Sequence, residues 1–304
     1  MDKAFQKITD TISQVVFGKT EEVKLALTCL FAGGHLLIED RPGIGKTTLG
    51  KVLSQCLGLA FTRIQYTSDM LPGDLIGVSI YHQESGSFLF HKGPIFTQVL
   101  LADEINRATP KTQSALLEAM EEWQVTVEGK THTLEKPFFV IATQNPLEQS
   151  GTYPLPESQL DRFLMRISIG YPDRKAERRL LETGNRKTVI EEIEPVLDTQ
   201  QVMDIREQIA AVHVSETFYD YMQDVLEFTR SSIHFTHGLS PRAGLALLHT
   251  TRSWAFLAGR DHVIPEDLQA IFPFVASHRL QSRETMGEYS FQQLKELLME
   301  VPVP

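Results

Sequence analysis

The sequence predicts an α/β domain built on a five-stranded parallel sheet, followed by an all-helical domain. Between residues 35 and 171, short apolar runs alternate with amphipathic segments of helical spacing, the pattern of a parallel sheet covered on both faces. After residue 172 only helical patterns follow. A chain of 304 residues is long enough for two domains, which we place at 1–172 and 173–304.

Five apolar runs are the candidate strands of the sheet. They lie at 35–39, 61–66, 99–103, 138–143 and 163–169. After the first run, Leu49, Val52 and Leu53 recur at helical spacing. A further helix is expected to begin near Thr109, as a capping residue, with Pro110 at its first position.

Two stretches interrupt this alternation and are predicted to project from the sheet as hairpins. Near 79–90, two strand-like segments flank a polar loop, and 124–134 alternates around Glu128-Gly129. In the second domain, helices are predicted at 173–183, 198–211, 215–232, 240–258, 265–280 and 290–300.

The composition, with 42% hydrophobic and 22% charged residues, is that of a soluble globular protein. The net charge of −10 argues against a wide DNA-binding surface, because phosphate contacts dominate that affinity. Cys29 and Cys56 lie in apolar helical patterns and are expected to be buried, reduced thiols. The first residues lack the apolar core of a signal peptide, and no apolar run approaches the ~20 residues of a membrane span. We therefore expect a cytoplasmic protein without a transmembrane segment.

Residues 42–48 form a loop suited to the phosphates of a nucleoside triphosphate: Pro42-Gly43-Ile44-Gly45-Lys46-Thr47-Thr48. The two glycines let the backbone turn its N–H groups onto the β-phosphate at the start of a helix. Lys46 can reach the β- and γ-phosphates, and the hydroxyl of Thr47 can hold Mg²⁺. The usual first glycine of such a loop is replaced by Asp40. Its charge would repel the phosphates unless the side chain points away.

Polar side chains end two of the predicted strands, at the edge where ligands of parallel sheets bind. Asp103 would hold Mg²⁺ through its water shell, and Glu104 would polarise the attacking water as a general base. Asn145 can orient this water or touch the γ-phosphate, with Thr143 as the second candidate. Without the phosphate loop, a solvated acidic strand end would be the better interpretation of Asp103 and Glu104.

Several longer motifs then resemble the MoxR branch of the AAA+ ATPases, and the resemblance spans essentially the whole chain. The motifs are Asp103-Glu104-Ile105-Asn106-Arg107-Ala108, residues 111–120, Ala142-Thr143-Gln144-Asn145-Pro146, residues 151–157 and Leu160-Asp161-Arg162-Phe163. The resemblance implies a P-loop NTPase αβα domain with a helical lid, and it implies ATP and Mg²⁺ as ligands.

The same resemblance implies roles that spacing does not show. Asn145 matches the sensor-1 position, and Arg162 matches the arginine finger that reaches the nucleotide of a neighbouring subunit. Arg242 matches sensor 2 on the lid. Val16-Phe17-Gly18-Lys19 resembles the segment that packs against adenine, and the two hairpins match insertions that face a central pore in relatives. The alternatives are a surface salt bridge for Arg162 and a pairing with a nearby carboxylate for Arg242.

The resulting hypothesis is an ATPase whose active form is a homo-oligomeric ring, expected to be a hexamer, that remodels, assembles or activates a client protein complex. By resemblance only, the partner is a protein with a von Willebrand factor A-type domain. Three rivals remain: a DNA-translocating motor, a nucleotide-gated binding module with little turnover, and specificity for GTP. An acidic balance disfavours the first, and the absence of an Asn-Lys-x-Asp motif disfavours the third.

Overall fold

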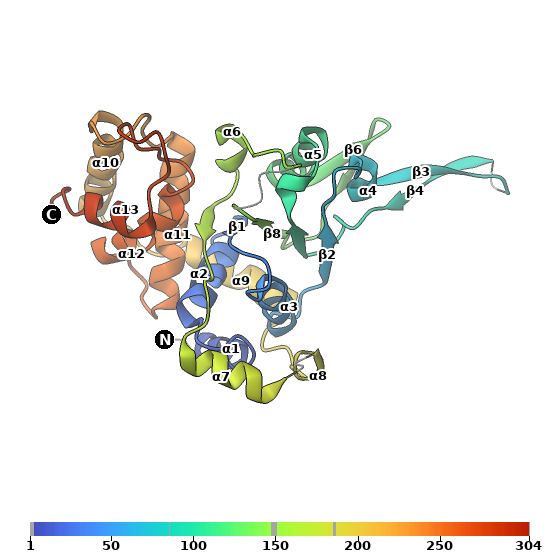
Figure 1. Ribbon diagram of the computed structural model, residues 1–304, viewed down its shortest axis with the longest axis horizontal. Coiled ribbons are helices and arrows are strands. Elements are labelled where there is room, and N and C mark those ends of the chain that lie inside the picture. Colours follow the sequence, from blue (N-terminus) through green and yellow to red (C-terminus); the bar gives the residue numbers. More distant parts are fainter. Residues whose placement is uncertain (1–2, 85, 147–150, 185–186, 304) are drawn as a thin grey trace.

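The computed structural model describes residues 3–84, 86–146, 151–184 and 187–303. An α/β core forms the middle of the molecule, a block of helices lies at one end, and a two-stranded hairpin projects from the other end (Figure 1).

The predicted sheet is confirmed as a five-stranded, fully parallel sheet with strand order β2-β5-β8-β1-β9. The strands are β1 (Leu36–Glu39), β2 (Phe61–Gln65), β5 (Val99–Asp103), β8 (Phe139–Gln144) and β9 (Met165–Ile167). The phosphate loop follows β1, and the acidic pair Asp103-Glu104 follows β5. A single strand, β8, lies between β1 and β5. Both lie at the carboxyl edge.

Helices cover both faces of the sheet, as the near-continuous apolar strands predict. Successive strand residues point to opposite faces, so Leu36 and Ile38 pack into one hydrophobic core and Leu37 packs into a second. The first core is shared with α1 (Lys3–Ser13), α2 (Thr20–Phe31) and α3 (Lys46–Cys56). The second is shared with α5 (Pro110–Glu122), which follows the short 3-10 helix η1 (Ile105–Arg107).

Helix α5 begins as predicted, with Thr109 at the N-cap and Pro110 in the first turn. The side chain of Thr109 makes no capping bond to the described backbone, and its hydroxyl instead lies 3.3 Å from that of Thr112. The capping part of that prediction is wrong. Cys29 and Cys56 are free and buried, as expected, and burial raises the pKa of the Cys56 thiol to about 12.

Both predicted hairpins form. The longer one, β3 (Gly77–His82) and β4 (Ser87–Lys92), follows the short helix α4 (Pro72–Ile76) and extends away from the core (Figure 1). The shorter one, β6 (Gln124–Val127) and β7 (Lys130–Thr133), turns at Glu128 and Gly129, which both have positive φ. The rings of Phe90 and His132 stack at 4.2 Å, so the two hairpins contact each other.

The helices after residue 172 follow the predicted ranges closely, with two differences. They are α7 (Arg174–Thr183), α8 (Lys187–Glu191), α9 (Thr199–Ala210), α10 (Glu216–Ser231), α11 (Pro241–Leu257), α12 (Pro265–Ala276) and α13 (Phe291–Leu298). Helix α8 was not predicted, since one turn is too short to show a helical period. Helix α12 ends before 280, because His278 and Arg279 turn out of it to bind the core.

These helices do not all belong to one block. Helix α9 contacts α2 and α11, and α8 contacts α3. Helix α7 contacts the segment that follows α1, where Arg179 lies over the ring of Phe17. Helices α10 to α13 form the block at the end of the molecule (Figure 1). The domain boundary at residue 172 thus stays a prediction. Within the described residues, none of the helices combines the length and the apolar character that a membrane crossing requires.

Candidate nucleotide-binding site

The loop between β1 and α3 has the backbone geometry of a phosphate cradle. Gly43 and Gly45 have φ values of 84° and 97°, a left-handed region that glycine adopts without steric cost. Gly45 is the N-cap of α3, and no described side chain caps this helix. The first N–H groups of a helix lack intrahelical acceptors and carry its positive end. A Cβ atom at either glycine would meet no atom within 4 Å, so the space above the loop is open.

A cavity of about 560 Å³ lies beside this loop, a volume within the ordinary range of small-molecule sites. The cavity brings together segments that are far apart in the sequence. Its lining residues are Val15, Val16, Phe17, Lys19, Pro42, Gly43, Ile44, Gly45, Thr48, Tyr171, Pro172, Glu177, Leu180, Leu181 and Gly184. The predicted adenine segment and the phosphate loop therefore border one space.

Helix α7 forms a further wall of this cavity, which the sequence did not indicate. Gly18 has a φ of 68°, and a Cβ atom there would lie 2.9 Å from that of Ala176. A larger residue would push α7 away, so Gly18 itself is needed for the approach of this helix. The guanidinium of Arg179 lies 4.6 Å from the ring centre of Phe17, over its face. The wall is thus fixed to the adenine segment.

The side chain of Lys46 is buried and bends back over the loop. Its Nζ donates a 2.6 Å hydrogen bond to the backbone oxygen of Asp40. Burial lowers the pKa of Lys46, and the negative charges of Asp103, Asp40 and Glu104 oppose this change. The ammonium group therefore lies within electrostatic reach of the acidic pair, as the two motifs together predict.

The side chain of Asp40 is held away from the space above the loop. One carboxylate oxygen accepts a 2.8 Å bond from the N–H of Arg41. The other accepts bonds from the hydroxyl of Ser168, at 2.9 Å, and from the N–H of Gly170, at 2.6 Å. Asp40 therefore ties the loop to the segment that follows β9, and these donors satisfy its charge.

Asp103 is buried at the carboxyl end of β5, with each oxygen bound by a different side chain. Thr143 Oγ1 donates a 2.6 Å bond to Oδ1, and Arg63 Nη2 donates a 2.7 Å bond to Oδ2. Thr47 is half-buried in the first turn of α3. Both predicted Mg²⁺ ligands supply oxygen atoms, which this ion prefers.

Glu104 has a positive φ of 57°, which is strained for a non-glycine residue. Its N–H donates a 2.9 Å bond to Thr143 Oγ1, so this one hydroxyl orders both acidic residues. The carboxylate of Glu104 lies 3.3 Å from Arg107 Nε. Asn145 is half-buried directly after β8, whose neighbour β5 carries the acidic pair.

Arg162 and Arg242 lie together at a different place. Arg162 Nε donates a 2.8 Å bond to Glu121 Oε2, and Arg242 Nη2 donates to Glu121 Oε1. Both line a separate cavity of about 260 Å³, and neither lines the one beside the phosphate loop. Arg162 precedes β9 whereas the loop follows the adjacent parallel β1, so the two lie at opposite edges of the sheet.

Sequence reasoning did not single out Arg63, Glu121 or α7. The sequence indicates a contact between Arg63 and Asp103 only when the pairing of β2 with β5 is known. Glu121 lies in the acidic pair Glu121-Glu122 at the end of a helix, a pattern that exposed helix ends share. Helix α7 was predicted as a helix, but the segment that it packs against, at Phe17 and Gly18, is distant in the sequence.

Known proteins similar to this chain identify the family to which it belongs. Residues 35–165 match the family described as "ATPase family associated with various cellular activities (AAA)", and residues 227–296 match the "AAA lid domain". The uncharacterized protein YeaC of Bacillus subtilis is 44% identical, over 90% of this chain and 86% of its own length. The chaperone MoxR1 of Mycobacterium tuberculosis is 38% identical, over 88% of this chain and 73% of its own.

The fold has a counterpart among solved structures. A crystal structure of a protein from Cytophaga hutchinsonii, described as a candidate ATPase, superposes with a TM-score of 0.90 at 36% identity. The match covers 98% of this chain and 94% of that one. An AAA-type core, a helical lid and MoxR relatives over most of the length agree with one another. The chain belongs to the MoxR family of AAA+ ATPases.

Proposed function

We propose that this chain binds ATP with Mg²⁺ in the cavity beside residues 42–48 and hydrolyses it. The observation that carries the proposal is the placement of Lys46. Its buried ammonium group lies at the phosphate loop within reach of the charges of Asp103 and Glu104. A cation between an N–H-lined loop and two carboxylates suits a polyphosphate tail on one side and a divalent metal on the other.

The residues present fit Mg²⁺. The hydroxyl of Thr47 and the carboxylate of Asp103 would hold it, the latter through water. When bound, Mg²⁺ neutralises charge on the β- and γ-phosphate oxygens. Thr143 keeps the Asp103 carboxylate oriented through its 2.6 Å bond, so one ligand is ordered in advance.

Glu104 is proposed as the general base. Its N–H donates to Thr143, and its backbone is left-handed, at φ 57° and ψ 50°, directly after β5. Strain of this kind persists only where surrounding contacts impose it, and it concentrates at functional sites. Asn145, after the adjacent strand, is proposed to orient the attacking water.

Arg162 and Arg242 are proposed to act on the nucleotide of a neighbouring copy. A strand of β1's length, four residues, separates the two edges of the sheet by roughly 10 Å, so Arg162 cannot readily reach its own phosphate loop. An arginine supplied from a neighbour can contribute ~10³–10⁵ in rate. A closed ring of identical head-to-tail interfaces, which we expect to be a hexamer, gives each site such a neighbour.

We propose further that this cytoplasmic ring uses hydrolysis to remodel, assemble or activate a client protein complex. The relative named a chaperone supports this class of role. A client with a von Willebrand factor A-type domain remains a prediction from family resemblance.

The test compares phosphate release by wild type and Glu104→Gln at saturating ATP and Mg²⁺. We expect wild type to turn over and the variant to lose activity by about 10²-fold or more while it still binds ATP. Equal, near-zero rates would leave only a nucleotide-gated binding module. Equal competition by GTP would contradict ATP specificity, and a DNA-stimulated rate with a steep salt dependence would favour the motor.

A further inference from the structure

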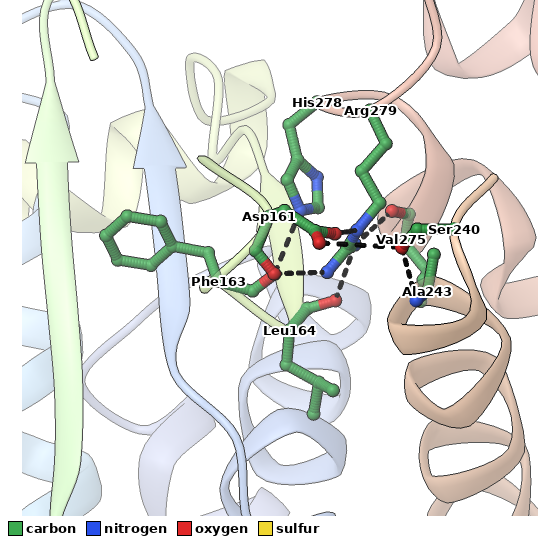
Figure 2. Close-up of polar contacts among 8 residues, drawn as sticks. All are labelled: Asp161, Phe163, Leu164, Ser240, Ala243, Val275, His278 and Arg279. Carbon is green, nitrogen blue, oxygen red and sulfur yellow. Dashed lines mark hydrogen bonds and ion pairs between the residues drawn. The ribbon is translucent and has the colours of Figure 1, made fainter. Parts of the chain in front are cut away.

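The segment that carries Arg162 is bound on both sides by the lid. Residues 161–164 connect α6 (Glu157–Leu160) to β9, and Arg279, just past the end of α12, reaches into this connection (Figure 2). Its Nε donates a 2.6 Å bond to the carboxylate of Asp161, and its Nη2 donates a 2.7 Å bond to the backbone oxygen of Phe163. The residues directly before and after Arg162 are therefore held by one guanidinium.

Further bonds make this contact specific. Arg279 also donates to the backbone oxygens of Asp161, at 3.1 Å, and of Leu164, at 3.3 Å. The Nε2 of His278 donates a 2.9 Å bond to the oxygen of Phe163 (Figure 2). The side chain of Arg279 is only 5% exposed. A planar guanidinium that makes several hydrogen bonds fixes both the position and the orientation of the segment it binds, which the single ammonium group of a lysine cannot do.

The same lid supplies Arg242. Ser240, the N-cap of α11, lies 3.5 Å from the second oxygen of Asp161, and Arg242 follows in the first turn of that helix. Arg162 and Arg242 then meet on the two oxygens of Glu121. Glu121 therefore holds Arg162 and Arg242 side by side. The lid also binds Asp161, the residue before Arg162, through Arg279 and Ser240.

We propose that Arg279 is a positioning residue: it fixes the segment 161–164 to the lid, so that the placement of the lid sets the placement of Arg162 at the neighbouring nucleotide. This rests on the proposed function, because it requires Arg162 to act across an interface. A rigid connection of this kind transmits a lid movement directly to the arginine. Turnover at one site would then depend on the lid of the adjacent subunit.

The test uses Arg279→Lys, with Arg260→Lys as the matched control. Arg260 is bound to Asp267 in another largely buried ion pair of the lid, which does not contact residues 161–164. We expect Arg279→Lys to lower kcat by about tenfold or more while the KM and Kd for ATP stay within roughly twofold. Arg260→Lys, at a comparable loss of Tm, should keep kcat.

Mixing separates positioning from a structural role. Arg279→Lys mixed with Lys46→Ala should regain activity, since an intact Arg162 from one variant meets an intact phosphate loop of the other at about a quarter of interfaces.

Asp161→Asn, which keeps an acceptor for Arg279, should show a weaker form of the same defect. The positioning role is overturned, and the proposed function stands, if Arg162→Ala lowers turnover but Arg279→Lys does not. The same conclusion follows if Arg162→Ala regains activity on mixing with Lys46→Ala but Arg279→Lys does not. If Arg162→Ala changes nothing, the in-trans role fails, and this inference with it.

Discussion

The carboxylate of Asp103 is bound by Arg63, with 2.7 Å to Nη2 and 3.2 Å to Nε. The register of β2 and β5 places Gln65 opposite Asp103, so Arg63 is its diagonal neighbour on the same face. The Arg63 side chain is 47% exposed, although Asp103 is buried, so solvent reaches the Arg63 end of this ion pair and lowers the cost of breaking it. We infer that Arg63 balances the charge of Asp103 before Mg²⁺ binds and competes with the ion for it.

Arg63→Gln should therefore lower the half-saturating Mg²⁺ concentration for ATP hydrolysis, by roughly three- to tenfold, because the competing charge is removed. A Mg²⁺ titration at fixed ATP measures this. Arg283→Gln removes the same charge from an exposed position on the lid and should leave the titration unchanged. A higher Mg²⁺ requirement in Arg63→Gln would mean that Arg63 orients Asp103 and does not compete.

Asp40→Asn should lower stability more than it changes ATP affinity. The neutral amide of asparagine cannot reproduce the charge-assisted bonds that Asp40 accepts from Ser168 and Gly170. We expect their loss to lower the free energy of unfolding by about 1–2 kcal/mol. Urea unfolding and ATP titration measure the two effects. Ser168→Ala breaks part of the same link without a charge change and should give a smaller loss. A gain of tenfold or more in ATP affinity for Asp40→Asn would show that this carboxylate repels the phosphates after all.

Arg162→Ala should reduce turnover and spare ATP binding, because Arg162 lies at the opposite edge of the sheet from its own phosphate loop. A loss of ~10³-fold or more is expected from an arginine supplied by a neighbour. Mixing Arg162→Ala with Lys46→Ala should restore part of the activity. Absence of recovery would leave a local ion pair with Glu121 as the sole role of Arg162.

Acidification should destabilise the protein through His35. Its Nε2 donates a 3.1 Å bond to the oxygen of Met120, and its Nδ1 accepts a 3.0 Å bond from the N–H of Val140. Burial lowers the pKa of His35 to about 4, so the unfolded chain binds the proton first as pH falls. The stabilisation is complete above pH 6.5 and is lost as pH falls from 6.5 toward 4, by about 3 kcal/mol.

Urea unfolding of wild type and His35→Gln at several pH values between 7.5 and 4.5 tests this sign. The variant should be less stable at pH 7.5 but lose less stability on acidification. Burial also lowers the pKa of His278, so a part of the pH dependence should remain in the variant. An equal slope in both proteins would show that His35 is not the group responsible.

Much of the fold could be predicted because its signals are local. Strands β1, β5 and β8 are short apolar runs with side chains buried on both faces of the sheet, as for Leu36 and Leu37. The hairpin at Glu128 and Gly129 was predictable because its strands alternate in sequence and Gly129 readily adopts the positive φ that the turn requires. The order of the strands was not, because β1 pairs with β8 and β9 through contacts that no short window of sequence contains.

The site divides in the same way. Gly43 to Thr47 could be identified because one continuous segment supplies the whole loop. Asp103 was identified by its strand end, but its partner Arg63 depends on the register of a second strand. The pairing of Arg162 with Arg242 on Glu121 joins three distant segments, and only the folded chain shows it.

The most direct test of the central claim is ATP binding and phosphate release by Lys46→Ala, beside Lys51→Ala one turn later on the same helix. Lys51 is partly exposed and pairs with Glu191, so its loss should leave both quantities close to wild type. Lys46→Ala should abolish phosphate release and weaken or abolish ATP binding, with an unchanged circular dichroism spectrum. Wild-type affinity and turnover in Lys46→Ala would contradict the assignment of this loop as the nucleotide site.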